Sequence, residues 1–217
     1  MKILFITDLH GHFDALAKLP AADMLLVGGD FTNFGSPEEF QAAMRLVEAC
    51  FPNFLSVAGN LDPGEEADHI LAGAGHLIGT AVQIVNGLRM MGVSGSHVCP
   101  RPTPYEWDDE ARCAALASLP LSRVDILVTH APPYGFGADV IPNGMHVGSK
   151  YVKRLAELTS PIVHLCGHIH EASGVFAENG AVLVNPGAFG DEGNYALLEL
   201  PCNGCPVVTL GKAVEGK

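Results

Sequence analysis

Five apolar runs along the chain share one feature: each is nearly continuous and ends at a polar residue. The runs are Ile3–Thr7, Met24–Val27, Phe54–Ala58, Ile126–Thr129 and Ile162–Cys166. Continuous rather than alternating hydrophobicity is typical of strands that are buried on both faces. Each run therefore predicts a central strand of a sheet that is covered on both sides.

Segments with helical character separate several of these runs. The clearest start is at Ser36, where Ser-Pro-Glu-Glu offers an N-cap, a proline at the first helical position and Glu39 for a capping box. We expect this helix to run to about Cys50. Further helices are expected over His12–Leu19, Glu65–Ala72, Glu106–Leu119 and Ser149–Leu158. The alternation of strands and helices predicts an α/β fold with parallel strands.

Three Asn-Gly pairs lie between strand-like segments and predict type I′ hairpins, because both turn positions need positive φ. The pairs are Asn86-Gly87, Asn179-Gly180 and Asn203-Gly204. Antiparallel strands therefore accompany the parallel ones. The simplest architecture is two mixed β-sheets packed face to face as a sandwich and flanked by helices. No repeat or linker divides the chain, so we expect a single domain over residues 1–217.

Two long connections are expected to carry function, because structureless loops of this length are otherwise uncommon. They are Ser94–Tyr105, which holds three prolines, and Ala131–Val147, which is rich in glycine and proline.

The composition of the chain indicates which partners are disfavoured and which cellular location we expect. The 217 residues include 12 Lys+Arg and 24 Asp+Glu, a formal net charge of −12, which disfavours extended nucleic acid and anionic membranes as partners. No apolar run reaches the roughly 18–20 residues that a membrane span requires. The N-terminal run turns polar too early for a signal peptide. We therefore expect a cytoplasmic protein whose six cysteines are free thiols.

The polar residues that end the apolar runs include two carboxylates, one amide and four imidazoles. Because ligands bind beyond the carboxyl ends of strands in α/β sheets, we expect these side chains to share one edge. The set lacks a thiolate and suits Mn, Fe, Co or Zn better than a structural zinc cage. Two ions about 3.5–4 Å apart, sharing a bridging carboxylate, would use all seven. The predicted metal ligands are Asp8, His10, Asp30, Asn60, His130, His168 and His170.

The order of these motifs resembles the calcineurin-like metallophosphoesterase superfamily. The motifs read Asp8-Leu9-His10, Gly29-Asp30, Gly59-Asn60, Thr129-His130 and Gly167-His168-Ile169-His170, and together they cover most of the chain. The sequence Gly-His-Ile-His-Glu, after a long loop that begins His-Ala-Pro-Pro, is most similar to small phosphoesterases related to the cyclic-nucleotide phosphodiesterase branch. The resemblance implies a two-sheet sandwich flanked by helices.

The resemblance also implies roles for the seven residues. Asp8, His10 and His170 would hold one ion, Asn60, His130 and His168 would hold the other, and Asp30 would bridge them. Asp30, Asn60 and His130 are the implied catalytic residues, and a metal-bridging hydroxide would attack phosphorus. We expect two divalent ions, with Mn²⁺ favoured over Fe, Zn, Co or Ni. The expected substrate is a small phosphate ester, and family analogy allows a homodimer.

One position departs from the family pattern. Many members read Gly-Asn-His-Asp or Gly-Asn-His-Glu, and this chain reads Gly59-Asn60-Leu61-Asp62. The family histidine contacts substrate and is thought to protonate the leaving group, which leucine cannot do. Since general-acid catalysis is typically worth about 10²–10⁴-fold, we expect phosphodiesters, or esters with acidic leaving groups, to be preferred over alkyl monoesters. Candidate substrate contacts are His12, His97, Arg101 and His146, and the three histidines are also candidate acids.

Other interpretations stay open at this stage. His69, His76 and His164 are expected to be surface or core residues, with His164 hydrogen-bonded in the core. A nuclease acting on short nucleic acid would use the same site. A non-catalytic interaction scaffold, as in a membrane-trafficking coat subunit that resembles this fold, would have eroded ligands, whereas all seven are present here. A serine or cysteine hydrolase is disfavoured because no Gly-x-Ser-x-Gly elbow occurs.

Overall fold

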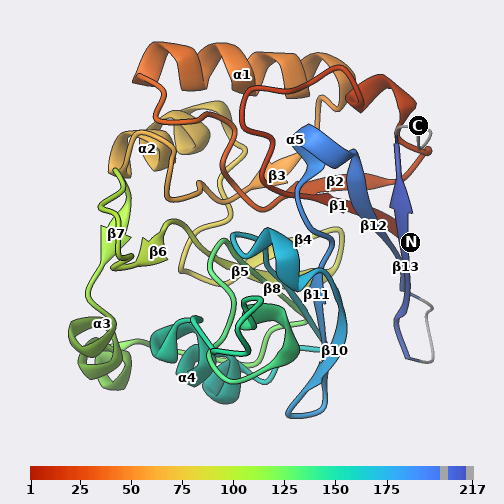
Figure 1. The fold of residues 1–217 in the computed structure, drawn as a ribbon. Coiled ribbons are helices and arrows are strands. Elements are labelled where there is room, and N and C mark those ends of the chain that lie inside the picture. Colours follow the sequence, from red (N-terminus) through yellow and green to blue (C-terminus); the bar gives the residue numbers. More distant parts are fainter. Residues whose placement is uncertain (201–204, 214–217) are drawn as a thin grey trace.

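Two β-sheets pack face to face in the computed structural model, which describes residues 1–200 and 205–213 (Figure 1). The five-stranded sheet has the order β13 (Val207–Lys212), β12 (Asn194–Glu199), β1 (Lys2–Ile6), β2 (Met24–Val27), β3 (Leu55–Ser56). The six-stranded sheet has the order β10 (Gly174–Glu178), β11 (Ala181–Asn185), β9 (Val163–Leu165), β8 (Ile126–Thr129), β5 (Leu88–Val93), β4 (Gln83–Val85). A separate short pair joins β6 (Ser96–His97) to β7 (Glu106–Trp107).

Each sheet combines parallel and antiparallel neighbours. In the first sheet β1, β2 and β3 run parallel, β12 lies antiparallel beside β1, and β13 lies antiparallel beside β12. In the second sheet β5, β8, β9 and β11 run parallel, and β4 and β10 are antiparallel at the two edges. The five apolar runs form the parallel strands β1, β2, β3, β8 and β9, so the predicted sandwich of two mixed sheets is confirmed.

Helices cover both outer faces of the sandwich (Figure 1). Helices α1 (Pro37–Cys50) and α2 (Glu65–Ala74) pack on the five-stranded sheet, with Phe40 and Val47 against Val27 in one cluster. Helices α3 (Asp109–Ala115) and α4 (Lys150–Thr159) cover the six-stranded sheet. The layer between the sheets is a third cluster of fully buried side chains, to which both sheets contribute: Phe5, Leu26, Met90, Val128 and Leu165.

Local capping determines where the helices begin. At α1 the backbone N–H of Glu39 donates to Ser36 Oγ and that of Ser36 donates to Glu39 Oε2, which is the predicted capping box. Ser149 caps α4 in the expected place by accepting from the N–H of Val152. Short helical turns complete the chain: α5 (Phe189–Glu192), η1 (Leu16–Lys18), η2 (Leu116–Ser118), η3 (Gly137–Asp139) and η4 (His170–Ala172).

Two predicted helices were wrong in extent. Only the 3₁₀ turn η1 forms within His12–Leu19, because the preceding N–H groups of Leu9, His10 and Gly11 donate to the loop after β2 and tie the chain to that loop. The segment Glu106–Leu119 begins as strand β7, which pairs with β6. It becomes helical only after Asp108, which caps α3 through the N–H of Ala111.

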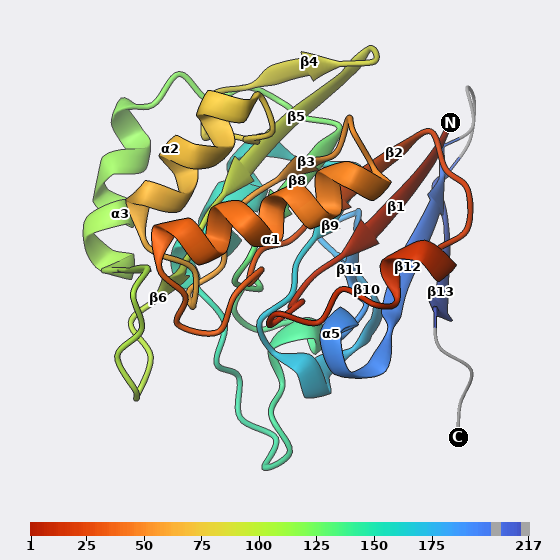
Figure 2. The same cartoon turned by 90° about the horizontal axis from the view of Figure 1, so that it is seen from above.

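Two of the three predicted Asn-Gly hairpin turns lie in the described residues, and both form. Asn86 and Gly87 connect β4 to β5, Asn179 and Gly180 connect β10 to β11, and all four have positive φ, as a type I′ turn requires. The pair Asn203-Gly204 lies outside the described residues. The loop after β8, drawn in green to teal, projects from the body in Figure 2 and contains η3.

Two further sequence expectations concern the cysteines and membrane-spanning segments. Five cysteines, Cys50, Cys99, Cys113, Cys166 and Cys205, are free, and Cys202 lies outside the described residues. Within residues 1–200 and 205–213, no helix combines the length and the apolar character that crossing a bilayer would require.

Candidate metal centre

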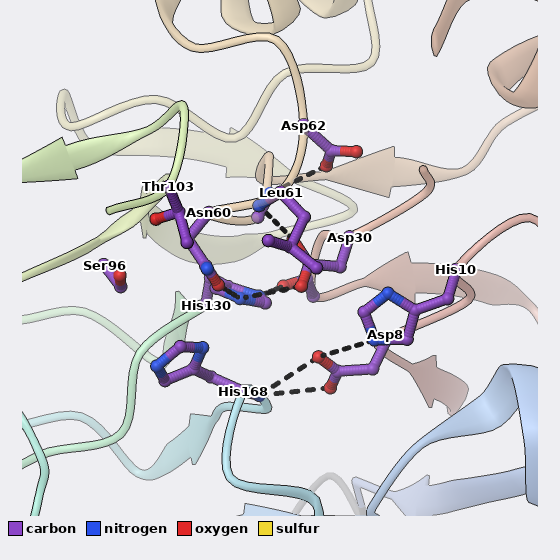
Figure 3. A network of polar contacts seen from close by, with 12 residues as sticks. Asp8, His10, Asp30, Asn60, Leu61, Asp62, Ser96, Thr103, His130 and His168 are labelled. Carbon is purple, nitrogen blue, oxygen red and sulfur yellow. Dashed lines mark hydrogen bonds and ion pairs between the residues drawn. The ribbon is translucent and has the colours of Figure 1, made fainter. Parts of the chain in front are cut away.

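The loops that follow the parallel strands meet at one edge of the sandwich, where backbone hydrogen bonds tie them together. The N–H of Asp8, after β1, donates to Gly29 O, and that of His10 donates to Asp30 O. The N–H of Gly167, after β9, donates to the carbonyl of His130, after β8. These contacts place side chains from both sheets around one space, which Figure 3 shows.

One group of donor atoms consists of Asp8, His10 and His170, whose ligand atoms all lie within 4.8 Å of one another. Asp8 Oδ1 is 3.2 Å from His170 Nε2 and 3.9 Å from His10 Nε2. The two imidazole Nε2 atoms are 3.3 Å apart. This is the trio that the resemblance assigns to the first ion.

A second group shares Asp8 and adds Asp30 and His130, again within 4.8 Å. His130 Nε2 is 3.5 Å from Asp30 Oδ2 and 2.7 Å from Asn60 Oδ1. His130 Nδ1 donates to the carbonyl of Gly28, 2.8 Å away, so a neutral His130 turns its Nε2 lone pair toward Asn60 Oδ1. Two acceptors facing each other are stabilised by a cation placed between them.

The ring of His168 lies beside this second group. Its centroid is 5.1 Å from that of His130, and its backbone N–H donates to both carboxylate oxygens of Asp8, at 3.1 and 3.3 Å. His168 Nε2 is 3.8 Å from Cys99 Sγ. Sequence reasoning placed no thiol near the site, and no motif signals one, because Cys99 arrives on the Ser94–Tyr105 loop.

Burial controls the charge state of these groups. Burial, with repulsion from Asp62 and Asp8, raises the pKa of Asp30 well above its ordinary value. Burial also tends to raise the pKa of Asp8, but the hydrogen bond with His170 and the nearby imidazoles outweigh it and hold that pKa below its usual range. The pKa of His168 falls to about 3, mainly through burial and then through repulsion from His130.

The same environment leaves most imidazoles neutral. Burial lowers the pKa of both His130 and His10, and the hydrogen bond with Asp8 raises that of His170. Within the described part of the chain, no lysine or arginine pairs with Asp8, Asp30 or Asp62. Buried carboxylates without a cationic side chain, surrounded by neutral imidazoles, fit divalent metal ions.

Backbone strain is concentrated at the same residues. Asp8, His10, Asp30 and His168 have φ of 58°, 47°, 53° and 68°, in the left-handed region that residues other than glycine rarely adopt. Such conformations cost on the order of 1–3 kcal/mol each and persist where the surroundings impose them. Here the hydrogen-bonded loops impose them and aim the side chains into one space.

The turn that carries Asn60 approaches Asp30 closely because Gly59 has no side chain. A Cβ atom at Gly59 would overlap the backbone nitrogen and Oδ1 of Asp30. The N–H of Leu61 donates to that Oδ1 at 2.8 Å, so the backbone of this turn holds the carboxylate while the Leu61 side chain contributes no polar group. The turn is visible above Asp30 in Figure 3.

Asp62 has a role that sequence reasoning left open. Its buried carboxylate accepts from the N–H groups of Gly59, Phe31 and Thr32 and from the Thr32 hydroxyl. Burial raises its pKa to about 6 despite these hydrogen bonds. Asp62 therefore ties the loop after β2 to the loop after β3, and only its position after the Gly-Asn pair hinted at this.

The four expected substrate contacts lie in different surroundings. His12 is exposed, with Nε2 3.9 Å from Asp191 Oδ1. Arg101 is exposed on the Ser94–Tyr105 loop. His97 and His146 line one cavity together with His168. Of the other histidines, His69 is exposed and His76 and His164 are buried, and His164 is hydrogen-bonded as predicted.

Comparison with known proteins agrees with this geometry. Residues 1–172 match the family model described as calcineurin-like phosphoesterase. An uncharacterized protein of Methanocaldococcus jannaschii is 32% identical over 194 residues, covering 86% of this chain and 88% of that protein. A Synechococcus protein named probable cyclic nucleotide phosphodiesterase is 27% identical over 198 residues, covering 79% of this chain and 74% of that protein.

The fold is shared with solved structures as well. The crystal structure of the Thermus thermophilus protein TT1561 has a TM-score of 0.72 and 22% identity, covering 98% of this chain and 99% of that one. The family match supports metal-dependent hydrolysis of a phosphoester, and the structure provides candidate ligands for the metal. By its motifs, its fold and its match over residues 1–172, this chain belongs to the calcineurin-like phosphoesterase family.

Proposed function

We propose that this protein is a phosphodiesterase that uses two divalent metal ions, with Mn²⁺ favoured. One observation carries the proposal: two groups of donor atoms, Asp8–His10–His170 and Asp8–Asp30–His130, lie side by side with Asp8 in common. Asn60 adds an amide oxygen to the second group, and His168 adds an imidazole next to it. When bound, two ions would supply a water of lowered pKa and would neutralise charge on the phosphoryl group.

The chain's own residues would set the charge of the site. Asp8 and Asp30 are the carboxylates in the two groups, and the remaining candidate ligands are imidazoles and one amide. Two divalent ions would outweigh the two carboxylates and leave a positive site for an anionic phosphate. The net charge of −12 over the whole chain disfavours an extended nucleic acid, so we propose a small phosphate ester as substrate.

Leu61 favours a diester over a monoester. Its backbone N–H holds Asp30, but its side chain cannot protonate a leaving group. A poor leaving group needs that proton most, so alkyl monoesters are the substrates most affected. The resemblance to a relative named as a cyclic nucleotide phosphodiesterase supports the same choice.

The experiment is a substrate panel with added Mn²⁺. Nitrophenyl diesters, alkyl phosphate monoesters, cyclic nucleotides and a short oligonucleotide are assayed with the wild type, with Asp30→Asn and with a matched control, His69→Gln, on the exposed face of α2. We expect the wild type to hydrolyse diesters and to bind about two ions per chain. Asp30→Asn should lose turnover, and His69→Gln should keep the turnover and metal content of the wild type.

Two results would contradict the proposal. Turnover of alkyl monoesters equal to that of diesters would refute the diester preference. Less than one bound ion per chain, with no ester hydrolysed, would favour a non-catalytic scaffold.

A further inference from the structure

A cavity of about 590 Å³ opens beside the candidate metal centre and receives residues from both long loops. His168 and Ile169 line it on the metal side, and His97, Tyr134, His146 and Val147 line other parts of its wall. Its size suits an organic group attached to a phosphate. One histidine of the loop after β8, His146, lines this cavity.

His146 is oriented by a buried carboxylate. Its Nδ1 atom lies 2.6 Å from Asp139 Oδ1, and Asp139 is fully buried whereas the imidazole is 39% exposed. Asp139 Oδ2 accepts from the N–H groups of Gly135 and Gly148, at 2.9 and 3.0 Å. Asp139 thus acts as an acceptor toward all three of these N–H groups, and it keeps a proton on Nδ1 of His146.

The opposite ring nitrogen of His146 remains free. Among the described residues no hydrogen-bond partner lies within reach of its Nε2. The loop around it is short and closed: Val140 pairs with His146, and the N–H of Val147 donates to Asp139 O. A histidine with one nitrogen bound to a buried carboxylate and the other open to a cavity is the arrangement of a proton-transfer group.

We propose that His146 is the acid that protonates the leaving-group oxygen, with Asp139 as the residue that positions it. This inference rests on the proposed function. The bond between phosphorus and the leaving oxygen breaks, and its electron pair stays on that oxygen. The oxygen takes the Nε2 proton of a His146 ring that carries protons on both nitrogens, and the Nδ1 proton stays in the hydrogen bond to Asp139. Water forms the new bond to phosphorus and releases a proton to solvent, and solvent restores the proton on His146. His146 serves a leaving group that occupies this cavity, as the organic group of a diester would. A small alkyl monoester does not reach His146 and still lacks the donor that Leu61 cannot provide.

Other groups facing the cavity are less suited to this role. His97 Nδ1 is buried without a hydrogen-bond partner, so no carboxylate orients that ring. Asp109 is engaged at the start of α4, where it accepts from Ser149 Oγ and from the N–H of Lys150. Tyr134 packs its ring 5.8 Å from that of His146 and lies as a wall beside it.

The test compares two methyl aryl phosphodiesters that differ only in the leaving group, 4-nitrophenolate and phenolate. His146→Gln removes the acid but keeps an amide that can contact Asp139. We expect it to lose activity on both esters and to lose at least about tenfold more on the phenyl ester, within the range of general-acid effects. Asp139→Asn is expected to show the same asymmetry in weaker form.

His97→Gln and His69→Gln are the matched controls, and each should change the two esters by equal factors. A loss in His146→Gln that is equal for both esters would overturn the proposal, and so would an asymmetry found in His97→Gln instead. Wild-type protein that hydrolyses neither ester would refute the proposed function and not this assignment.

A measurement without metal or substrate separates a positioned histidine from a misfolded variant. In proton NMR spectra of the metal-free chain, the Nδ1–H···Asp139 hydrogen bond should give a downfield imidazole proton. That signal should be absent in His146→Gln and present in His97→Gln. Its presence in His146→Gln would show that His146 is not held as described.

Discussion

His164 Nδ1 lies 2.7 Å from Glu178 Oε2, in a pair whose side chains are 0% and 1% exposed. On its other side, His164 Nε2 lies 2.9 Å from Thr129 Oγ1, and that hydroxyl donates to the carbonyl of Ala131. The oxygen of Thr129 therefore accepts from Nε2, so the ring of His164 is held on both sides. The pair supports the end of β8, where the candidate ligand His130 follows Thr129.

Removing one partner of this pair should be costly. Glu178→Leu leaves His164 Nδ1 buried without its partner, and we expect the free energy of unfolding to fall by about 1–3 kcal/mol. The double variant His164→Leu/Glu178→Leu should recover much of that loss, because it leaves no buried group unpaired. Urea denaturation of the wild type, both single variants and the double variant measures the coupling. A double variant whose loss equals the sum of the two single losses would mean that the groups do not act as a pair.

Leu61→His tests the departure from the family pattern. The Leu61 N–H that holds Asp30 belongs to the backbone and is kept in the variant. A histidine at this position should add a proton donor and raise kcat/KM for alkyl phosphate monoesters by roughly 10²-fold, the low end of general-acid effects. Steady-state kinetics on an alkyl monoester and a nitrophenyl diester, with Leu61→Gln as control, measures this gain. An equal gain from glutamine would exclude proton donation as its cause.

The fold was largely predictable because the sequence signals that define its strands and its first helix are local. Continuous apolar runs fix strands that are buried on both faces, and the Ser36–Glu39 box fixes the start of α1. The two wrong helices failed for a non-local reason. The chain around His12 is held by the loop after β2, and Glu106 pairs with a strand ten residues earlier. No local propensity records such partners.

For the candidate site too, the residues that follow a general rule were predicted and those that depend on loop folding were not. The strand-end rule brought Asp8, Asp30 and His130 together without any structure, since parallel strands share a carboxyl edge. Asp139 was not identified, because its importance comes from folding back onto His146 and two backbone N–H groups within one irregular loop. Cys99 was missed likewise, since its distance to His168 depends on how the Ser94–Tyr105 loop crosses the site.

Gly59→Ala should disable the centre without touching a ligand. Its methyl group would overlap Oδ1 and the backbone nitrogen of Asp30. Asp30 is buried, so these atoms have no free space into which to move. We expect Asp30 to be displaced, the number of Mn²⁺ ions bound per chain to fall below that of the wild type, and diester turnover to be lost. Elemental analysis of the bound metal and circular dichroism of the variant measure displacement and folding separately.

Gly73→Ala is the matched control for that substitution. Gly73 lies in α2, and a Cβ there would meet no atom within 4 Å. Alanine should stabilise the helix by about 0.5–1 kcal/mol and leave the bound metal unchanged. A Gly59→Ala protein with wild-type metal content would show that Asp30 does not depend on this close approach.

Arg89 and Asp125 should give one ion pair a measurable pH dependence. The guanidinium donates to both carboxylate oxygens, at 2.8 and 3.2 Å, and these hydrogen bonds hold the pKa of Asp125 below its ordinary value. Because the folded pKa is the lower one, the stabilisation is complete above the unfolded carboxyl value of about 3.9. It is lost as the pH falls through the folded value. Arg89 is 43% exposed, so solvent screening keeps the loss of stability in Arg89→Gln at pH 7 small. Thermal denaturation at a series of pH values should show this difference shrinking toward zero below about pH 3. A difference that persists in acid would assign the effect to packing of the arginine stem rather than to charge.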